Sequence, residues 1–220
     1  MSIQKLMIRK GFAIVLSIII CLVVSVPAHA GLPLDTVKAY SDKVLEVLRD
    51  PSLKGESTKK VRKERLRTIS EKMFDFTELS KRTLAQNWSK FNPGQQQEFV
   101  TLYTSLLEDA YSDKILSYTN EKIVFSKEVA LTEKTVEVQS TVVRKTTEIP
   151  IYYRVILKDG AWRVYDVVVE GVSLTNNYRS QFREILANKQ PESLLETLRK
   201  KVGGAGHSSG PASEPSQKKP

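Results

Sequence analysis

Residues 149–174, IPIYYRVILKDGAWRVYDVVVEGVSL, contain the β-hairpin that decides the fold. In its first half Ile151, Tyr153, Val155 and Leu157 alternate with other residues, which is the period of a strand with one buried face. Asp159-Gly160 follows, and this pair is typical of the tight turn between two antiparallel strands. Residues 161–169 then supply the second strand, so the chain forms an antiparallel sheet here.

Two further stretches extend this sheet toward the N-terminus. Residues 135–143 alternate, with Val136, Val138 and Val142 on one face, and residues 123–125 open the β region. The sequence therefore predicts three or four antiparallel strands.

Helical patterns precede and follow the strands. The clearest helix start is Asn92-Pro93-Gly94-Gln95, where Asn92 can cap the helix and Gln95 can complete a capping box. Apolar spacing predicts helices over residues 33–50, 58–73, 77–88, 93–118, 172–187 and 192–202. This order predicts an α+β fold in which helices pack on one face of an antiparallel sheet.

The N-terminus has the features of a secretory signal. Three basic residues precede the apolar run 12–26, which is 15 residues long, against roughly 20 in a transmembrane helix. Ala28-His29-Ala30 then offers a cleavage site, so we expect residues 1–30 to be removed before Gly31. An uncleaved anchor is disfavoured by the short run, and a lipoprotein anchor at Cys21 is disfavoured because Ile20 precedes it.

Removal of the signal changes the chemistry that is available. Cys21 and His29 leave with it, and His207, the remaining histidine, lies in the polar tail. The folded part then has neither Cys nor His, which excludes a Cys nucleophile, a Ser-His pair, disulfides and a zinc site of the usual ligands. The formal net charge falls from +9 to +6, because three of the 34 basic residues lie in the signal. A modest basic excess suits anionic membranes or acidic partners, and export argues against nucleic acid.

No other motif points to catalysis or to a cofactor. Asp166 and Glu170 are the best carboxylate pair, but on one strand they lie about 13 Å apart at ~3.3 Å per residue. Glycosidase pairs are roughly 5–9.5 Å apart. We therefore expect no enzyme activity and no cofactor. Asp166 is better placed to accept hydrogen bonds that hold the corner between the last strand and the next helix.

Three motifs resemble one known family. Residues 162–174, WRVYDVVVEGVSL, with Asn177-Tyr178-Arg179-Ser180-Gln181-Phe182 behind them, closely resemble the signature of the MlaC family, also called the toluene-tolerance auxiliary family. Phe74-Asp75-Phe76 with Trp88 resembles its second motif, and the segment from Asn92 to Tyr111 resembles its central helix. The similarity spans about Leu34 to Leu198, in the family's order.

The resemblance implies a periplasmic phospholipid carrier of a Gram-negative bacterium. Its fold would be cone-like, similar to nuclear transport factor 2, with a curved antiparallel sheet, packed helices and an internal apolar cavity. The phospholipid is the implied ligand. The implied partners are an inner-membrane ABC transporter complex, of which this would be the soluble component, and an outer-membrane lipoprotein–porin complex. We expect a monomer. The expected domains are the signal peptide 1–30, the lipid-binding domain 31–202 and a disordered polar tail 203–220.

The phase of the strands and helices predicts which residues line a slot for acyl chains. Residues of the central helix and of the sheet would form its walls, and Val172 and Leu174 would close it. The predicted lipid-binding residues are Phe99, Tyr103, Leu106, Tyr111, Val138, Val142, Tyr153, Val155, Val164, Val168, Val172 and Leu174. Core packing is the competing interpretation of the aromatic members.

The helix at residues 58–73 carries a basic face, from which we predict partner binding by Lys60, Arg62 and Lys63. A solvated helix face is the competing interpretation. Two alternatives to a phospholipid carrier stay open, namely a carrier of another apolar lipid such as a hopanoid, and a non-catalytic periplasmic adaptor with a filled core. A hydrolase of envelope substrates is a third class, which the lack of Cys and His disfavours.

Overall fold

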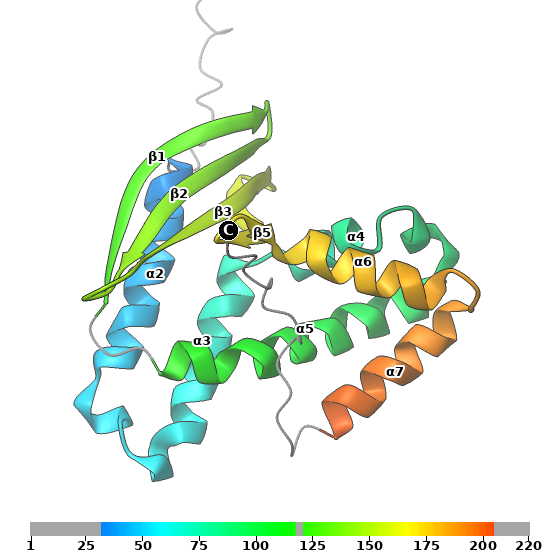
Figure 1. Cartoon of the computed structure of the whole chain (residues 1–220), viewed down its shortest axis with the longest axis horizontal. Helices are drawn as coiled ribbons and strands as arrows, with labels where there is room; N and C mark the ends of the chain where they lie inside the picture. Colours follow the sequence, from blue (N-terminus) through cyan, green and yellow to red (C-terminus); the bar gives the residue numbers. More distant parts are fainter. Residues whose placement is uncertain (1–31, 118–120, 205–220) are drawn as a thin grey trace, which may run out of the picture. The chain divides into compact units, whose positions relative to one another are not determined.

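The computed structural model describes residues 32–117 and 121–204 (Figure 1). The predicted signal peptide and residues 205–220 of the predicted tail lie outside this part of the chain. The described α-helices are α2 (Pro33–Arg49), α3 (Lys59–Met73), α4 (Phe76–Leu84), α5 (Pro93–Leu116), α6 (Leu174–Leu186) and α7 (Pro191–Gly203). Short 3₁₀ helices are η1 (Pro51–Leu53), η2 (Glu56–Thr58) and η3 (Ala85–Lys90).

The strands form one antiparallel sheet in the order β1-β2-β3-β4-β5 (Figure 1). Their bounds are β1 (Lys122–Thr132), β2 (Thr135–Val143), β3 (Glu148–Lys158), β4 (Ala161–Val169) and β5 (Val172–Ser173). The α+β class and the curved antiparallel sheet are thus confirmed, whereas the prediction of three or four strands missed β5. Residues 172–173 were predicted as helix, but they pair with β4, and Ser173 instead caps α6 by accepting a hydrogen bond from the backbone N–H of Asn176.

Two tight turns determine the register of the last strands. Asp159 and Gly160 have φ values of 51° and 75°, as a type I′ turn requires, so the predicted hairpin is confirmed. Glu170 and Gly171 repeat this conformation with φ values of 51° and 82°, and they turn β4 into β5. Positive φ is open to glycine, so an acidic residue followed by Gly marks both turns in the sequence.

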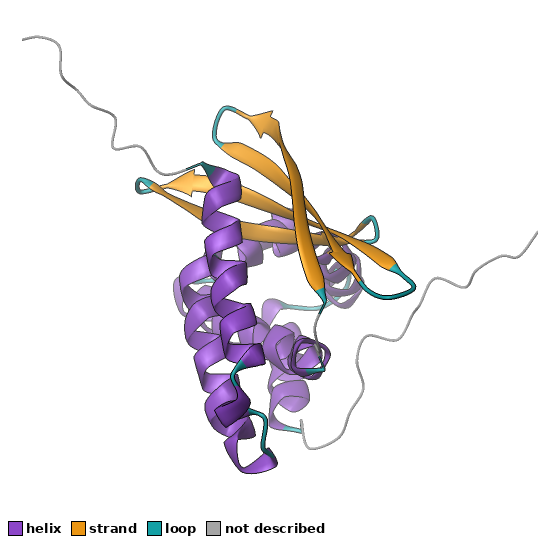
Figure 2. Ribbon diagram, turned by 90° about the vertical axis from the view of Figure 1, so that its left-hand side faces the viewer, coloured by secondary structure: helices purple, strands orange, loops and turns teal. Residues whose placement is uncertain are grey.

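A β-bulge in β4 reverses the side-chain phase along that strand. Val155 pairs with Val164 and Arg154 pairs with Asp166, so Tyr165 has no partner opposite it. Because one extra residue shifts the twofold alternation, Val164 and Asp166 lie on opposite faces of the sheet. Further register shifts in β1, after Phe125 and after Ala130, add to the curvature visible in Figure 2.

Helices and strands lie in separate layers (Figure 2). Val37 of α2 packs against one face of the sheet with Val138, Val155 and Val164; we call this the α2 face. The long helix α5, whose predicted capping box at Asn92 and Gln95 is confirmed, packs with α4, α6 and α7 in a second group. No helix in the described part of the chain is both long and apolar enough to span a membrane.

Candidate functional site

The apolar interior is divided into two clusters. The sheet cluster has the buried residues Val37, Met73, Val138, Val155 and Val164. The helical cluster has the buried residues Leu79, Leu84, Phe91, Phe99, Tyr103, Leu107, Tyr178, Phe182, Leu186, Leu194, Leu195 and Leu198. Of the described apolar residues, Phe74 alone packs against both clusters. The interior therefore has a seam between two separately packed parts, and Phe74 lies on that seam.

The predicted residues of α5 lie in or against the helical cluster. Phe99 and Tyr103 are fully buried, and their rings contact Phe182 at centroid distances of 5.7 and 5.3 Å. Burial raises the pKa of Tyr103 well above its usual value, so this phenol is neutral. In this structure the chain's own aromatic residues thus fill the space around Phe99 and Tyr103. Leu106 and Tyr111 are only partly buried at the edge of the same cluster.

Five of the six predicted sheet residues share the α2 face. Val138 pairs with Tyr153, and Val155 pairs with Val164, so these four lie together in or against the sheet cluster. Val142 lies on the same face further along β2. Val168 is on the opposite face because the Tyr165 bulge intervenes, which corrects its predicted position beside Val164.

One end of the α2 face carries an apolar strip that neither cluster includes. This strip extends from β1 to β5 through cross-strand partners on adjacent strands, namely Ile123–Val142, Val142–Ile149, Ile151–Val169 and Val169–Val172. We call these residues, Ile123, Val142, Ile149, Ile151, Val169 and Val172, the open strip. Val169 is 38% exposed and Val172 is 51% exposed. Val172 and Leu174, predicted as one closing pair, are separated, because Leu174 packs against the helical cluster.

Asp166 holds the corner between the sheet and α6, as the sequence predicted. Its carboxylate is 1% exposed and accepts hydrogen bonds from Ser173 Oγ at 2.6 Å and from the Thr175 backbone N–H at 3.0 Å. Arg154 donates to the same carboxylate at 3.2 Å and to Glu137 at 3.1 Å. Because Asp166 joins β4, β5 and the start of α6, it positions Val172 and the rest of the β4–β5 turn.

The predicted basic face on α3 is only partly free. Lys60 is exposed, but Lys63 lies 3.9 Å from Asp113 of α5, and Arg62 has a buried Nε without a hydrogen-bond partner among the described residues. One turn further, Arg67 lies 3.5 Å from Glu108 of α5. Part of the basic face therefore faces α5 instead of solvent, which the sequence pattern did not indicate.

The charged form of the Glu108 carboxyl is unfavourable in this contact. Burial raises the pKa of its carboxyl, and Arg67 offsets this only in part, while Glu71 and Asp109 add repulsion. A carboxyl with a raised pKa in the folded state destabilises the fold above that pKa, and the penalty disappears as the pH falls through it. We expect Glu108→Gln to raise the melting temperature slightly at pH 7 and to leave it unchanged at pH 4, measured by thermal circular dichroism. The exposed Glu196 is the control; equal effects of Glu108→Gln and Glu196→Gln would contradict this account.

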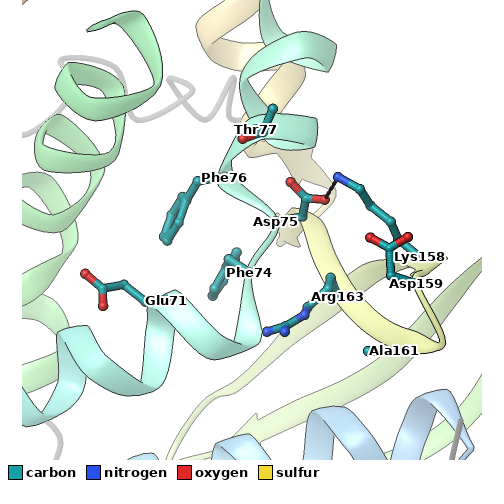
Figure 3. A pocket seen from close by; sticks show the side chains of 9 residues that line it. All are labelled: Glu71, Phe74, Asp75, Phe76, Thr77, Lys158, Asp159, Ala161 and Arg163. Atoms are coloured by element: carbon teal, nitrogen blue, oxygen red, sulfur yellow. Dashed lines mark hydrogen bonds and ion pairs between the residues drawn. The ribbon is translucent and has the colours of Figure 1, made fainter. Parts of the chain in front are cut away.

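A pocket of about 410 Å³ lies beside Phe74, between the α3–α4 junction and the β3–β4 hairpin (Figure 3). We call it the Phe74 pocket; it is lined by residues 74–77 and by Glu71, Lys158, Asp159, Ala161 and Arg163. Asp75 connects its two sides, because it accepts from Lys158 Nζ at 2.7 Å and caps α4 by accepting from the Glu78 N–H at 2.8 Å. Burial alone would raise the pKa of Asp75, but these hydrogen bonds outweigh it and hold the pKa below its usual value.

Sequence reasoning singled out Phe74-Asp75-Phe76 as a motif but did not predict a pocket there. The sequence could not indicate this pocket, because Lys158 and Arg163 are brought beside the motif only by the tertiary placement of the β3–β4 hairpin. Within the described ranges, no group of three or more His, Cys, Asp or Glu residues could hold a metal ion.

Comparisons with known proteins agree with this architecture. The family model described as "MlaC protein" matches residues 38–200. The chain is 26% identical over 121 residues to the intermembrane phospholipid transport system binding protein MlaC of Haemophilus influenzae; the match covers 53% of this chain and 56% of that protein, so it spans about half of that relative's length. It is 24% identical over 181 residues to toluene tolerance protein ttg2D of Pseudomonas putida, covering 81% of this chain and 82% of that protein.

A solved structure is also similar. It is the phospholipid-binding protein from Ralstonia solanacearum in complex with a phospholipid, with a TM-score of 0.72 and 25% identity. The match covers 80% of this chain and 99% of that chain. The common fold therefore extends over nearly all of a relative that was solved with its lipid.

Proposed function

Because the chain belongs to the MlaC family, we propose that it is a periplasmic carrier that moves phospholipid between the outer and inner membranes and so maintains outer-membrane lipid asymmetry. The observation that carries this proposal is the fold match with a relative in complex with a phospholipid. The N-terminal signal read from the sequence supports export. The proposed partners are an inner-membrane ABC transporter complex and an outer-membrane lipoprotein–porin complex.

Physical chemistry explains why such a carrier is needed. Two acyl chains of ordinary length would cost about 25 kcal/mol to move bare through water, at ~0.8 kcal/mol per CH₂. A carrier must therefore cover both chains with apolar side chains. The open strip supports this task, since it offers an apolar surface across five strands that the chain's own helices leave partly exposed. We propose that acyl chains lie against the open strip and extend into the seam between the two clusters.

Extraction of the purified protein tests the proposal directly. We expect phospholipid in near-stoichiometric amount when the mature protein, produced in a bacterial host, is extracted with organic solvent and analysed by mass spectrometry. A hopanoid or other apolar lipid in place of phospholipid would support the alternative carrier. Absence of any lipid would overturn the carrier proposal and favour the adaptor.

The basic face of α3 is the second feature to test. We propose that Lys60, Arg62 and Lys63 contact an acidic surface of the transporter complex. We expect the triple change of these residues to Glu to slow lipid transfer to that complex several-fold, and more at low salt, since exposed charges are screened within about 10 Å at 0.1 M salt. Transfer rates between labelled protein and transporter measure this.

Reversal of three basic residues elsewhere on the surface, the exposed Lys189, Lys200 and Lys201 near the C-terminal helix, is the control. Unchanged transfer in the α3 variant would remove the docking role and leave a solvated helix face.

A further inference from the structure

The charges around the Phe74 pocket leave one cation without an acceptor. Lys158 is paired with Asp75 at 2.7 Å, and Glu71 is paired with Arg67 at 3.2 Å. Arg163 has no hydrogen bond or ion pair with any residue of the described part of the chain, and its guanidinium points into the pocket toward Phe74 (Figure 3). A partly covered guanidinium with free N–H groups binds phosphate well, because its planar donors match two phosphate oxygens.

The apolar floor of the pocket indicates what is attached to that phosphate. Phe74 and Phe76 are stacked, with ring centroids 5.5 Å apart and planes inclined by 16° (Figure 3). Phe74 is also the residue that packs against both apolar clusters. A ligand held by Arg163 would therefore reach the seam of the interior with any apolar part that it carries. This placement favours an amphipathic ligand over a free ion.

The remaining charge indicates the kind of headgroup. The Asp159 carboxylate lines the same pocket, on the side of the hairpin turn (Figure 3). The pair of Asp75 with Lys158 and the pair of Glu71 with Arg67 each have no net charge. The charges that remain at the pocket are therefore one positive, on Arg163, and one negative, on Asp159. A headgroup with one phosphate and one amine complements both, whereas a purely anionic headgroup meets repulsion from Asp159. A volume of about 410 Å³ is ample for such a headgroup.

We propose that the Phe74 pocket is a headgroup site, in which Arg163 binds the phosphate of a zwitterionic phospholipid and Asp159 faces its amine. This rests on the proposed carrier function and adds to it a polar subsite at one end of the seam. A carrier that covered only the acyl chains would leave the headgroup in water. In the proposed site the protein binds the headgroup as well.

Binding of short-chain lipids tests the site. The probe is a short-chain phosphatidylethanolamine below its micelle concentration, titrated into the delipidated protein and followed by NMR or calorimetry. We expect Arg163→Gln to weaken this binding about tenfold, because it removes one charge-assisted hydrogen bond to the phosphate. Arg163→Lys is expected to weaken it less. The exposed Arg183 of α6 is the matched control, and Arg183→Gln is expected to bind like the wild type.

Three further ligands separate the possible sources of an effect. A diacylglycerol of the same chain length lacks the phosphate, so its binding is expected to be the same in wild type and Arg163→Gln; equal weakening would mean that Arg163 acts through the fold, and would overturn the site. Glycerophosphoethanolamine lacks the chains, and binding as tight as that of the lipid would make the pocket a site for soluble phosphodiesters instead. Phosphatidylglycerol is expected to bind more weakly than phosphatidylethanolamine, and Asp159→Asn to remove that difference.

The failure of this inference is distinguishable from failure of the carrier function. If wild type and Arg163→Gln bind phosphatidylethanolamine equally, the headgroup lies elsewhere and the carrier stands. Lys145, on the hairpin at the other end of the sheet, is the competing cation, since its neighbour Arg144 is paired with Glu121 at 3.2 Å, and an effect confined to Lys145→Gln would place the headgroup there. If the wild type binds no lipid at all, the carrier function itself fails.

Discussion

Replacement of Asp166 by asparagine is expected to lower the free energy of unfolding by about 3 kcal/mol, which corresponds to a fall of roughly 10 °C in melting temperature. The change is nearly isosteric, so it creates no cavity. It removes the charge that Ser173, the Thr175 N–H and Arg154 all contact, and it leaves these donors partly unsatisfied in a site that is 1% exposed. Denaturant unfolding followed by circular dichroism measures the effect.

Asp113→Asn is the matched control. Asp113 is also in an ion pair, with Lys63, but the contact is 3.9 Å long and its side chain is 81% exposed. Exposed pairs of this kind contribute about 0–1 kcal/mol. If Asp166→Asn destabilises no more than Asp113→Asn, Asp166 does not hold the corner between β4 and α6.

Replacement of both Val169 and Val172 by aspartate is expected to reduce the lipid that copurifies with the protein at least tenfold. Both valines lie on the open strip, and a carboxylate pressed against an acyl chain loses its hydration without gaining a partner. On insertion scales an aspartate in hydrocarbon costs about 2.5–3.5 kcal/mol, so two would suffice for this loss. Both side chains are exposed, so neither aspartate is buried, but the two carboxylates face each other across the β4–β5 pair, and the melting curve of the variant is therefore measured before its lipid content is compared. The measurement is the lipid-to-protein ratio by mass spectrometry.

Val61→Asp provides the control on another surface. Val61 of α3 is 47% exposed, close to the 51% of Val172, and it lies outside both clusters and the open strip. We expect its aspartate variant to retain lipid. Equal lipid content in the strip variant, with an unchanged melting curve, would show that acyl chains do not contact this end of the sheet.

Much of the fold follows from local chemistry. Asn92 and Gln95 form the predicted capping box, and Asp159-Gly160 forms the predicted turn, because each depends on residues within four positions of one another. Strand β2 begins and ends where alternation predicted, at Thr135 and Val143. Prediction failed at β5, because two residues are too few to show a period and the following helix pattern absorbed them.

The candidate site was less accessible to prediction. Val168 was placed by counting alternate residues from Val164, and the Tyr165 bulge between them invalidates that count. Phe99 and Tyr103 were predicted for the slot, and their own neighbours from α6 pack around them.

By itself the sequence determined the order of the helices and of the four longer strands, the Asp159-Gly160 turn, the capping box at Asn92 and Gln95, and the family, since these depend on neighbouring residues and on motifs that can be recognised in the chain. Within the hairpin of residues 149–174 it determined the turn and which residues of β3 share a face. Only the tertiary structure decided which face of β4 each later residue occupies, which apolar side chains the protein's own core uses, and that Arg163 and Phe74 share a pocket. The reason is physical: packing and charge pairing depend on distances between segments far apart in the chain, and a single bulged residue changes those distances without changing the local pattern.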